Sequence, residues 1–321
     1  MDKHKPLAPQ NRTLVLSAAD RQHYRSRLLT LQSAASLEAV TNRTLQQNFL
    51  EALPHLPAQS VDLLFLDPPY NLNKTFNQQR FGRTSLEDYE QWLESWFAKL
   101  LPLLKPTATI YCCGDWQSSS AIHRVISQHC KVRNRITWER EKGRGAKANW
   151  KNCSEDIWFC TLSNNYVFNV EAVKLKRRVL APYRDRSGQP KDWQTTDSGN
   201  FRITYPSNLW TDISVPFWSM PENTDHPTQK PEKLLAKLIL ASSEPDGVVL
   251  DPFLGSGTTS VVAKKLGRRY IGIERDEYFC CLAEKRLAST CDRAIQGYSG
   301  GYFWERNTFK HQQCQASPKL D

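Results

Sequence analysis

GVVLDPFLGSGTTSVVAKKLGRRYIGIERDE, residues 247–277, is the segment that decides the fold of this chain. Its apolar residues predict a strand at 247–250, a helix at 258–266 and a second strand at 269–273. Between the first strand and the helix lies Gly255-Ser256-Gly257. Glycines at such a turn let the backbone pass close to a ligand and place the helix N-terminus beside it. The segment therefore predicts a strand–helix–strand unit with a ligand-binding turn.

Two acids flank this turn and indicate the kind of ligand. Glu274, which ends the second strand, can accept hydrogen bonds from both hydroxyls of a ribose. Asp251 precedes the turn and could hold the ammonium group of a zwitterionic adenosine ligand. A lone Gly-x-Gly is also compatible with a simple tight turn, but the third glycine of a dinucleotide turn and a P-loop lysine are absent from the segment. The pattern favours an S-adenosylmethionine (AdoMet) pocket over NAD or ATP.

The preceding part of the chain repeats this alternation of strands and helices. Further strands are predicted at 61–66, 108–113, 135–138 and 156–161, and further helices at 86–101, 118–129 and 231–243. Short apolar strands separated by helices are typical of βαβ units. We therefore expect an α/β fold with a mainly parallel sheet.

Other parts of the chain lack this alternation. Residues 1–40 are polar, with one weak amphipathic stretch, and are interpreted as an N-terminal extension. Residues 140–225 show no regular apolar period but hold many aromatic residues, which favours an inserted lobe over a disordered linker. We therefore divide the chain into a core of 41–139 and 226–290, an insertion at 140–225 and a C-terminal tail at 291–321.

VDLLFLDPPYN, residues 61–71, joins an apolar strand to two prolines without a break. Because proline cannot donate to a strand ladder, the strand must end there. One interpretation is a plain strand end with a structural tyrosine. The other is a rigid platform that presents Asp67 and Tyr70 at the edge of the sheet.

The formal charge of +10 is concentrated in the middle of the chain. Residues 131–190 contain fourteen Lys and Arg residues against six acids. A solvated basic surface would explain this, but clustered basic residues beside aromatic ones are also what phosphate backbones and unstacked bases require. The segment is a candidate polyanion-binding region.

The composition is that of an ordinary globular protein, with no apolar run of the roughly 20 residues needed to cross a bilayer. The first residues have no apolar segment typical of a secretion signal. The nine cysteines form no Cys-x-x-Cys pair and their number is odd, so neither a zinc site nor a disulfide framework is indicated. We expect reduced thiols in the cytoplasm, and no membrane association.

Three motifs, taken in order, carry a resemblance. LDPPYN at 66–71, HPTQKP at 226–231 and DPFLGSGTT at 251–259 resemble the motifs of amino-methylating DNA methyltransferases. The order, with the catalytic block first and the AdoMet block last, is that of the β subgroup, which is typical of bacterial type II restriction–modification systems. The resemblance covers about residues 41–290. It implies an AdoMet-dependent, Rossmann-like, mainly parallel seven-stranded sheet with a target-recognition region inserted at 140–225.

The resemblance assigns catalysis to the DPPY motif. Asp67 would accept a hydrogen bond from the target amino group, with the Pro68 carbonyl as a second acceptor. Pro68 and Pro69 would fix that geometry, and Tyr70 would stack on a base flipped out of the duplex. Methyl transfer would then depend on positioning, and no metal is needed.

The resemblance also implies the cofactor-binding residues, which are Asp251, Pro252, Phe253, Gly255, Ser256, Gly257, Thr258, Thr259, Glu274, Asn71 and Lys230. Lys230 could reach the AdoMet carboxylate, although helix capping and surface charge would also explain Thr228 and Lys230. Family members often carry Gly-Asp-Cys before the DPPY strand, where this chain has LQQNFLEAL. Asn48 and Phe49 stand there instead, and could still bond an amino group and cover a purine.

The motifs leave the target base open. An Asp at the first motif position is usual for enzymes that methylate N6 of adenine, whereas enzymes for N4 of cytosine usually carry Ser, so we expect adenine with cytosine as the alternative. Methylation of RNA or of a protein is a more distant alternative, as is a DNA-binding module without activity. The intact motifs argue against the last of these.

Double-stranded DNA is the expected partner, and the insertion is expected to read it. The candidate DNA-binding residues are Arg140, Lys142, Arg144, Lys147, Lys151, Arg177 and Arg178, with Lys174 and Lys176 beside them. Most such residues contact phosphates and a few read base edges. A cognate restriction endonuclease would be a separate polypeptide, and the protein would act as a monomer or weak homodimer.

Overall fold

The computed structural model describes residues 8–76, 79–140, 148–179, 183–196, 199–290 and 294–305, with only the backbone described at 74–81. Among these residues the main sheet has eight strands. In spatial order they are β1 (Arg43–Gln46), β13 (Arg269–Glu274), β12 (Val248–Asp251), β2 (Val61–Leu66), β5 (Leu104–Gly114), β7 (Ser154–Thr161), β6 (Lys131–Glu139) and β11 (Leu209–Trp210). Neighbouring strands are parallel except that β7 is antiparallel to both β5 and β6. The expected mainly parallel sheet is confirmed.

Two strands of this sheet were not predicted. β1 has the half-polar sequence Arg-Thr-Leu-Gln, so it lacks an apolar run, and only its central residues are buried. β11 contains two residues and pairs with Thr137 and Trp138 of β6. A strand that short shows no periodicity in the sequence, so it could not be predicted. The sheet has eight strands, one more than the seven expected.

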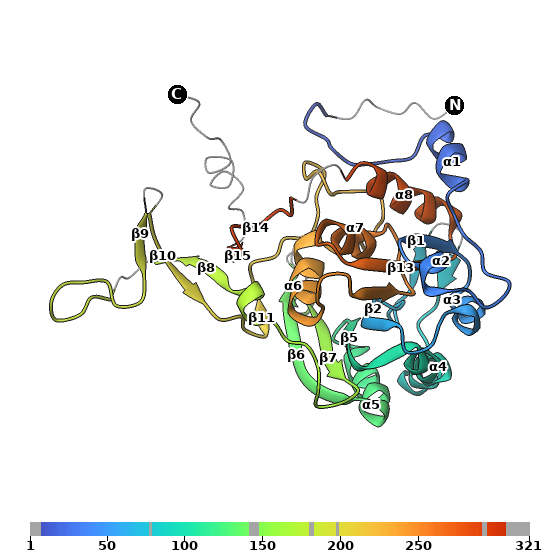
Figure 1. Ribbon diagram of the computed structural model, residues 1–321, viewed down its shortest axis with the longest axis horizontal. Coiled ribbons are helices and arrows are strands. Elements are labelled where there is room, and N and C mark those ends of the chain that lie inside the picture. The colour runs from blue at the N-terminus through green and yellow to red at the C-terminus, as the bar shows by residue number, and fades with distance from the viewer. Residues whose placement is uncertain are drawn as a thin grey trace.

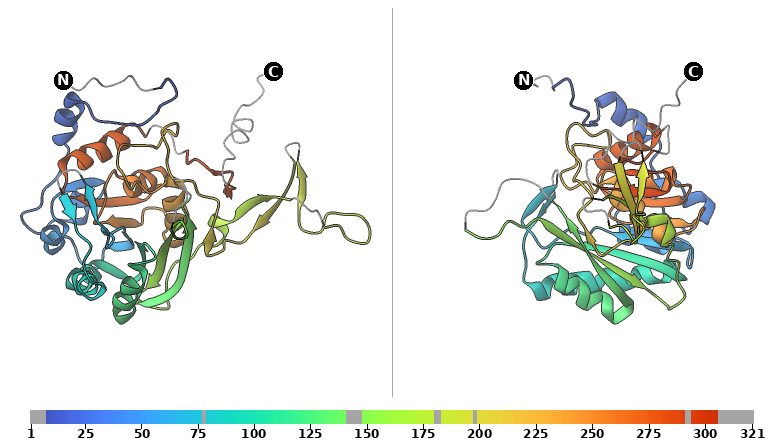
Figure 2. Two further views of the ribbon diagram at one scale, coloured as in Figure 1. Left: turned by 180° about the vertical axis from the view of Figure 1, so that it is seen from behind. Right: turned by 90° about the vertical axis from the view of Figure 1, so that its left-hand side faces the viewer.

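Helices cover both faces of the sheet (Figure 1 and Figure 2). On one face α4 (Leu86–Leu100) and α5 (Ser119–His129) share a core with Leu64 and Leu66 of β2. On the other face α6 (Glu232–Ser242) and α7 (Thr258–Lys265) share a core with Leu63 and Phe65. Side chains of a strand point to alternate faces, so β2 is buried on both sides. This explains its nearly continuous apolar sequence.

Helix α8 (Glu277–Ala288) was not predicted from the sequence, because its buried side includes charged residues. Glu284 accepts a hydrogen bond from Thr44, and Arg286 pairs with Glu232. The N-terminal extension packs on this helix through α1 (Ala18–Arg25), where Lys285 pairs with Asp20. Short helices follow at α2 (Leu37–Val40) and α3 (Phe49–Ala52), with 3-10 turns at Leu53–His55, Leu101–Leu103 and Glu171–Val173.

A second, five-stranded sheet projects from one side of the core (Figure 1). Its spatial order is β14 (Tyr298–Ser299), β15 (Tyr302–Trp304), β8 (Leu175–Arg178), β10 (Gly199–Thr204) and β9 (Gln194–Thr196). Residues 291–321, which were expected to form a C-terminal tail, therefore supply β14 and β15, and Phe303 and Trp304 are buried there. Conversely, β7 lies inside the predicted insertion but belongs to the main sheet. That the small sheet recognises DNA stays a prediction.

A third pairing joins β3 (Lys74–Phe76) to β4 (Gln79–Phe81), shortly after the DPPY motif. Among the described residues, no helix is long and apolar enough to span a membrane.

The strand directions bring the predicted motifs to one edge of the main sheet. The parallel strands β1, β2, β12 and β13 all end there, so the residues that follow them lie near one another. Because β7 runs in the opposite direction, its first residues reach the same edge. The candidate site is built from these chain ends.

Candidate active site

Asp67 and Tyr70 lie side by side directly after β2. The Tyr70 hydroxyl donates a hydrogen bond to Asp67 Oδ1 at 2.9 Å. The turn between them is held by Tyr89 of α4, whose hydroxyl donates to the Pro69 carbonyl at 3.0 Å. Burial, followed by the nearby charge of Asp67, raises the pKa of Tyr70 well above its usual value. The hydroxyl is therefore a stable donor to Asp67, and the sequence prediction that this turn presents both side chains is supported.

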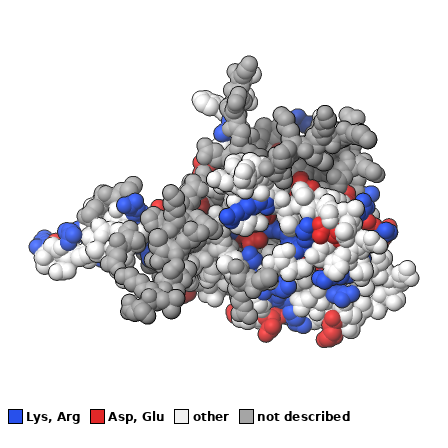
Figure 3. Space-filling view, turned by 90° about the horizontal axis from the view of Figure 1, so that it is seen from above, with Lys and Arg blue, Asp and Glu red and all other residues white. Residues whose placement is uncertain are grey.

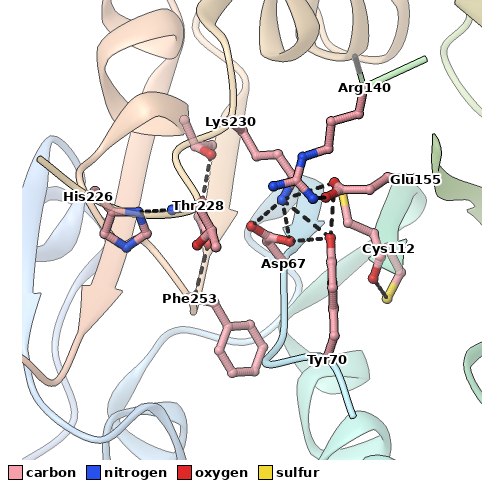
Figure 4. A network of polar contacts seen from close by, with 12 residues as sticks. Asp67, Tyr70, Cys112, Arg140, Glu155, His226, Thr228, Lys230 and Phe253 are labelled. Carbon is pink, nitrogen blue, oxygen red and sulfur yellow. Dashed lines mark hydrogen bonds and ion pairs between the residues drawn. The ribbon is translucent and has the colours of Figure 1, made fainter. Parts of the chain in front are cut away.

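Lys230 reaches this pair from the segment before α6. Its ammonium donates to both carboxylate oxygens of Asp67, at 2.8 and 2.7 Å, and lies 3.3 Å from the Tyr70 hydroxyl (Figure 4). Burial lowers the pKa of Lys230, but the carboxylates of Asp67 and Glu155 outweigh this and raise it above its usual value. Lys230 is therefore a buried cation, not a surface charge.

Glu155 and Arg140 complete the polar cluster. Glu155 is the second residue of β7, and its side chain is 3% exposed. Its Oε2 lies 3.4 Å from the Lys230 ammonium and accepts from Tyr70 at 3.3 Å. Arg140, directly after β6, donates to Glu155 Oε1 at 2.6 Å. Figure 4 shows Lys230, Tyr70 and Glu155 gathered around Asp67, with Arg140 reaching Glu155.

A cavity of about 310 Å³ opens beside this cluster. Its lining combines the Asp67–Tyr70 pair with an apolar wall and three further acids. It consists of Gln47, Asn48, Phe49, Leu50, Asp67, Pro68, Pro69, Tyr70, Trp92, Glu155, His226, Thr228, Lys230, Pro252, Phe253, Gly255, Glu274, Arg275, Asp276 and Phe279. Within the wall, the rings of Phe49 and Phe253 are 4.9 Å apart, and Trp96 packs behind Phe253 at 5.3 Å. A flat, partly apolar group fits against such a wall.

The glycine loop forms another side of the cavity. Gly255 has φ +54° and an added Cβ would lie 2.9 Å from the His226 ring, so only glycine fits there. Its N–H donates to Glu274 Oε2 at 3.0 Å, and the Asp276 N–H donates to Glu274 Oε1 at 2.9 Å. Burial raises the pKa of Glu274. The carboxylate still has lone pairs that can accept from a ligand in the cavity.

Asp251 stabilises the glycine loop through two hydrogen bonds. Its Oδ1 accepts from the Phe253 N–H at 2.9 Å and its Oδ2 accepts from the Thr259 hydroxyl at 2.6 Å. Burial raises the pKa of Asp251 to about 7, against the lowering effect of these hydrogen bonds. In this arrangement Asp251 shapes the loop that lines the cavity.

Other predicted cofactor residues also lie behind the lining. The buried guanidinium of Arg286 donates to the Ser256 carbonyl and to the Thr258 hydroxyl, both at 2.9 Å. Gly257 has φ +84° and packs against Ala283 of α8. The Asn71 side chain bonds to the backbone of Thr84. These residues fix the loops around the cavity, and a direct cofactor contact by any of them stays a prediction.

The two residues that depart from the family pattern do line the cavity. Phe49 belongs to the apolar wall. Asn48 caps α3 by accepting a hydrogen bond from the Leu50 N–H at 3.1 Å, which fixes the entrance of that helix beside the pocket. Pro252 lies next to Phe253 in the lining.

The predicted DNA-binding residues fall into separate places. Lys142, Arg144 and Lys147 lie outside the described residues. Arg140 is held in the polar cluster, Lys151 is half-buried, and Arg177 and Arg178 are on β8 of the small sheet, with Arg178 exposed. Seen from above, basic atoms lie at the far end of the projecting sheet, whereas basic and acidic atoms are interspersed over the core (Figure 3).

Sequence reasoning missed several residues of the site, among them Glu155, Trp92 and His226. Glu155 lies near the start of an apolar strand, but the direction of this strand in the sheet, which brings Glu155 to the cavity, is not encoded locally. Trp92 lies on the amphipathic helix α4 at a position that pattern alone assigns to the surface. His226 lies in the HPTQKP motif, and its contact with Gly255 could have been suspected from that motif.

Comparisons with known proteins agree with this geometry. A family model described as DNA methylase, covering N6 and N4 methylases, matches residues 61–285. The DNA adenine methyltransferase YhdJ of Escherichia coli K12 is 35% identical over 246 residues, which cover 74% of this chain and 80% of that protein. The type II methyltransferases M.HpaI of Haemophilus parainfluenzae and M.BglII of Bacillus subtilis are 31% and 30% identical. They cover 77% and 87% of this chain, and 74% and 81% of their own lengths.

Solved structures share the fold. The cytosine-N4-specific PvuII DNA methyltransferase superimposes with a TM-score of 0.57 at 17% identity, covering 83% of this chain and 89% of that one. A Thermus thermophilus protein in complex with S-adenosyl-L-methionine gives a TM-score of 0.52 at 21% identity, covering 83% and 98%. With the family model matching most of the chain, this protein belongs to the family of N6 and N4 DNA methylases.

Proposed function

We propose that this protein transfers a methyl group from AdoMet to the exocyclic N6 of adenine in duplex DNA. The observation that carries the proposal is the Asp67–Tyr70 pair, which faces a cavity that also presents Glu274 and an aromatic wall. The acceptor site and the donor site thus share one cavity.

The residues of the cavity fit AdoMet. The half-buried carboxylate of Glu274 retains lone pairs for the ribose hydroxyls, and Phe49 and Phe253 offer apolar surface to the adenine ring. The positive φ of Gly255 removes a side chain where the backbone approaches the ligand. When bound, AdoMet supplies an electrophilic methyl group on a sulfonium.

The chain itself contributes position and charge. The Asp67 carboxylate accepts a hydrogen bond from the target amino group and so turns the nitrogen lone pair toward the methyl group. The prolines and the Tyr89 contact hold this acceptor in place before the base arrives, so little reorganisation is needed. The Tyr70 ring supports the flipped base by stacking.

Adenine is favoured over cytosine by two observations. Asp occupies the first position of the DPPY motif, and the three relatives include a named DNA adenine methyltransferase. The likeness to the cytosine-N4-specific PvuII enzyme concerns the fold alone. N4 of cytosine is the alternative target, because both amino groups present the same geometry to Asp67.

Two of the relatives are type II methyltransferases, which supports a role in restriction–modification. We propose that the small sheet and the segment after β6 recognise a defined DNA sequence, and that methylation there protects host DNA from a separate restriction endonuclease. A cytoplasmic protein that acts as a monomer or weak homodimer suits this role.

A single assay tests the proposal. The protein is incubated with methyl-labelled AdoMet and duplex DNA, the DNA is digested to nucleosides, and the labelled nucleoside is identified. We expect N6-methyladenine, whereas N4-methylcytosine would contradict the adenine assignment and absence of label would contradict the enzyme assignment. Asp67→Asn removes an acceptor oxygen while keeping the shape of the side chain. It should abolish transfer and leave AdoMet binding within about threefold of wild type.

A further inference from the structure

Four charged side chains form a connected row at the acceptor site. Two carboxylates, Asp67 and Glu155, alternate with two cations, Lys230 and Arg140. Lys230 lies between the carboxylates, at 2.7 Å from Asp67 and 3.4 Å from Glu155. Because the side chains of Lys230 and Glu155 are only 7% and 3% exposed, water screens this cluster poorly.

Lys230 competes with the target amino group for the acceptor oxygens of Asp67. Its ammonium donates to both oxygens of Asp67, and the Tyr70 hydroxyl donates to one of them as well. A carboxylate has about four acceptor positions, and charge-assisted hydrogen bonds are the strongest that it makes. An ammonium held fully by Asp67 therefore weakens that carboxylate as an acceptor for a neutral amino group.

Glu155 offers the ammonium a second acceptor. Arg140 binds Glu155 Oε1, which fixes the carboxylate and leaves Oε2 facing Lys230 and Tyr70. The positive charge of Lys230 is needed, since it offsets the repulsion between the two carboxylates. The arrangement thus divides the ammonium between two acids.

We propose that Glu155 is a positioning residue for methyl transfer: it draws the Lys230 ammonium away from Asp67 when the target amino group enters, so that Asp67 can accept from that group. The inference rests on the proposed function. Arg140, which directly follows β6, holds the Glu155 carboxylate in the orientation that faces Lys230.

Glu155→Gln tests the proposal, since its amide can still accept from Arg140 but turns an NH₂ group toward Lys230. The ammonium is then left to Asp67. In single-turnover assays at saturating AdoMet and DNA, we expect the transfer rate to fall by about tenfold or more, with the Kd of AdoMet within about threefold of wild type. Glu90→Gln is the matched control, because Glu90 pairs with Arg124 on the surface of α4 and should leave the rate unchanged.

A second substitution separates this role from a structural one. Lys230→Met in the Glu155→Gln background removes the competing ammonium and restores the charge balance between Asp67 and Arg140. The double variant should therefore transfer methyl groups faster than Glu155→Gln alone, a rescue that general damage to the fold would not produce. If Glu155→Gln does not fold, Arg140→Gln/Glu155→Gln keeps the net charge of the cluster and should show the same slow transfer.

The proposal is overturned if Glu155→Gln, or the charge-balanced variant in its place, transfers within about twofold of Glu90→Gln. It is also overturned if removing Lys230 brings no rescue. Absence of transfer by the wild-type protein would instead contradict the proposed function, so the two failures are distinguishable.

Discussion

The Glu274 carboxylate accepts a hydrogen bond from the Gly255 N–H at 3.0 Å, and so joins the end of β13 to the glycine loop after β12. The same carboxylate binds the Asp276 N–H at the start of the next segment and lines the cavity. One acid therefore both shapes the loop and faces the proposed cofactor.

Glu274→Gln should weaken AdoMet binding. The amide has one acceptor oxygen where the carboxylate has two, so it cannot satisfy the backbone donors and the ribose hydroxyls together. We expect the Kd of AdoMet, measured by calorimetry, to rise about tenfold or more. An unchanged Kd in a folded variant would show that Glu274 does not bind the cofactor.

Gly257→Ala should destabilise the protein. Gly257 has φ +84°, and an added Cβ would lie 2.5 Å from the Ala283 Cβ on α8. Gly267 is the matched control, since it has φ +71° but nothing lies within 4 Å of an added Cβ. Both variants bear a left-handed backbone cost of about 1–2 kcal/mol, and Gly257→Ala bears the clash in addition. Its melting temperature should be the lower of the two.

Glu222 should make stability depend on pH. Its carboxylate accepts from the Glu232 N–H at the start of α6, and burial, with the nearby Glu232 charge, raises the pKa of Glu222 to about 8. The usual value is 4.5. The folded protein thus keeps a proton that the unfolded chain releases, and this contribution to stability is lost as the pH rises from about 4.5 to 8. The side chain of the Glu222→Gln variant cannot ionise, so the variant lacks this pH-dependent contribution.

Thermal unfolding of the wild type and Glu222→Gln across this pH range measures the effect. The melting temperature of the variant should gain on that of the wild type as the pH rises. Groups that do not interact with Glu222 titrate alike in both proteins, so their contributions cancel in the difference. A difference that is constant with pH would contradict the raised pKa of Glu222.

Arg178 should contribute to DNA binding through charge. It is exposed on β8 of the small sheet, where a phosphate can reach it. Arg178→Ala should weaken binding to any DNA sequence and reduce the slope of log K against log salt by about one. Arg124→Ala on α5, where the arginine pairs with Glu90, should leave the slope unchanged. Equal slopes for the two variants would exclude a phosphate contact by Arg178.

Local pattern predicted much of the core and its motifs. The strands at 61–66 and 269–273 match β2 and β13 closely, because both are buried on two faces and therefore carry continuous apolar sequence. The DPPY turn and the glycine loop were found for a related reason. Proline and glycine restrict or extend backbone geometry within a few residues, so their effect can be read locally.

Helix α8 was missed because its buried face carries Glu284 and Arg286, whose partners Thr44 and Glu232 are distant in the chain. The strands β14 and β15 were missed because they are short and β15 gains stability by pairing with β8, more than 100 residues earlier, while β14 pairs with β15. In both elements, burial is decided by contacts that no local window contains.

The sequence by itself singled out the residues to which we assign the chemistry, since Asp67, Tyr70 and the glycine loop lie in motifs whose spacing is local. Only the tertiary structure decided what surrounds them. β7 runs antiparallel to its neighbours, which brings Glu155 to the edge where β2 ends and places Lys230 between two carboxylates. The direction of a strand depends on long-range pairing, and so the charge balance of the acceptor site emerges only in the folded chain.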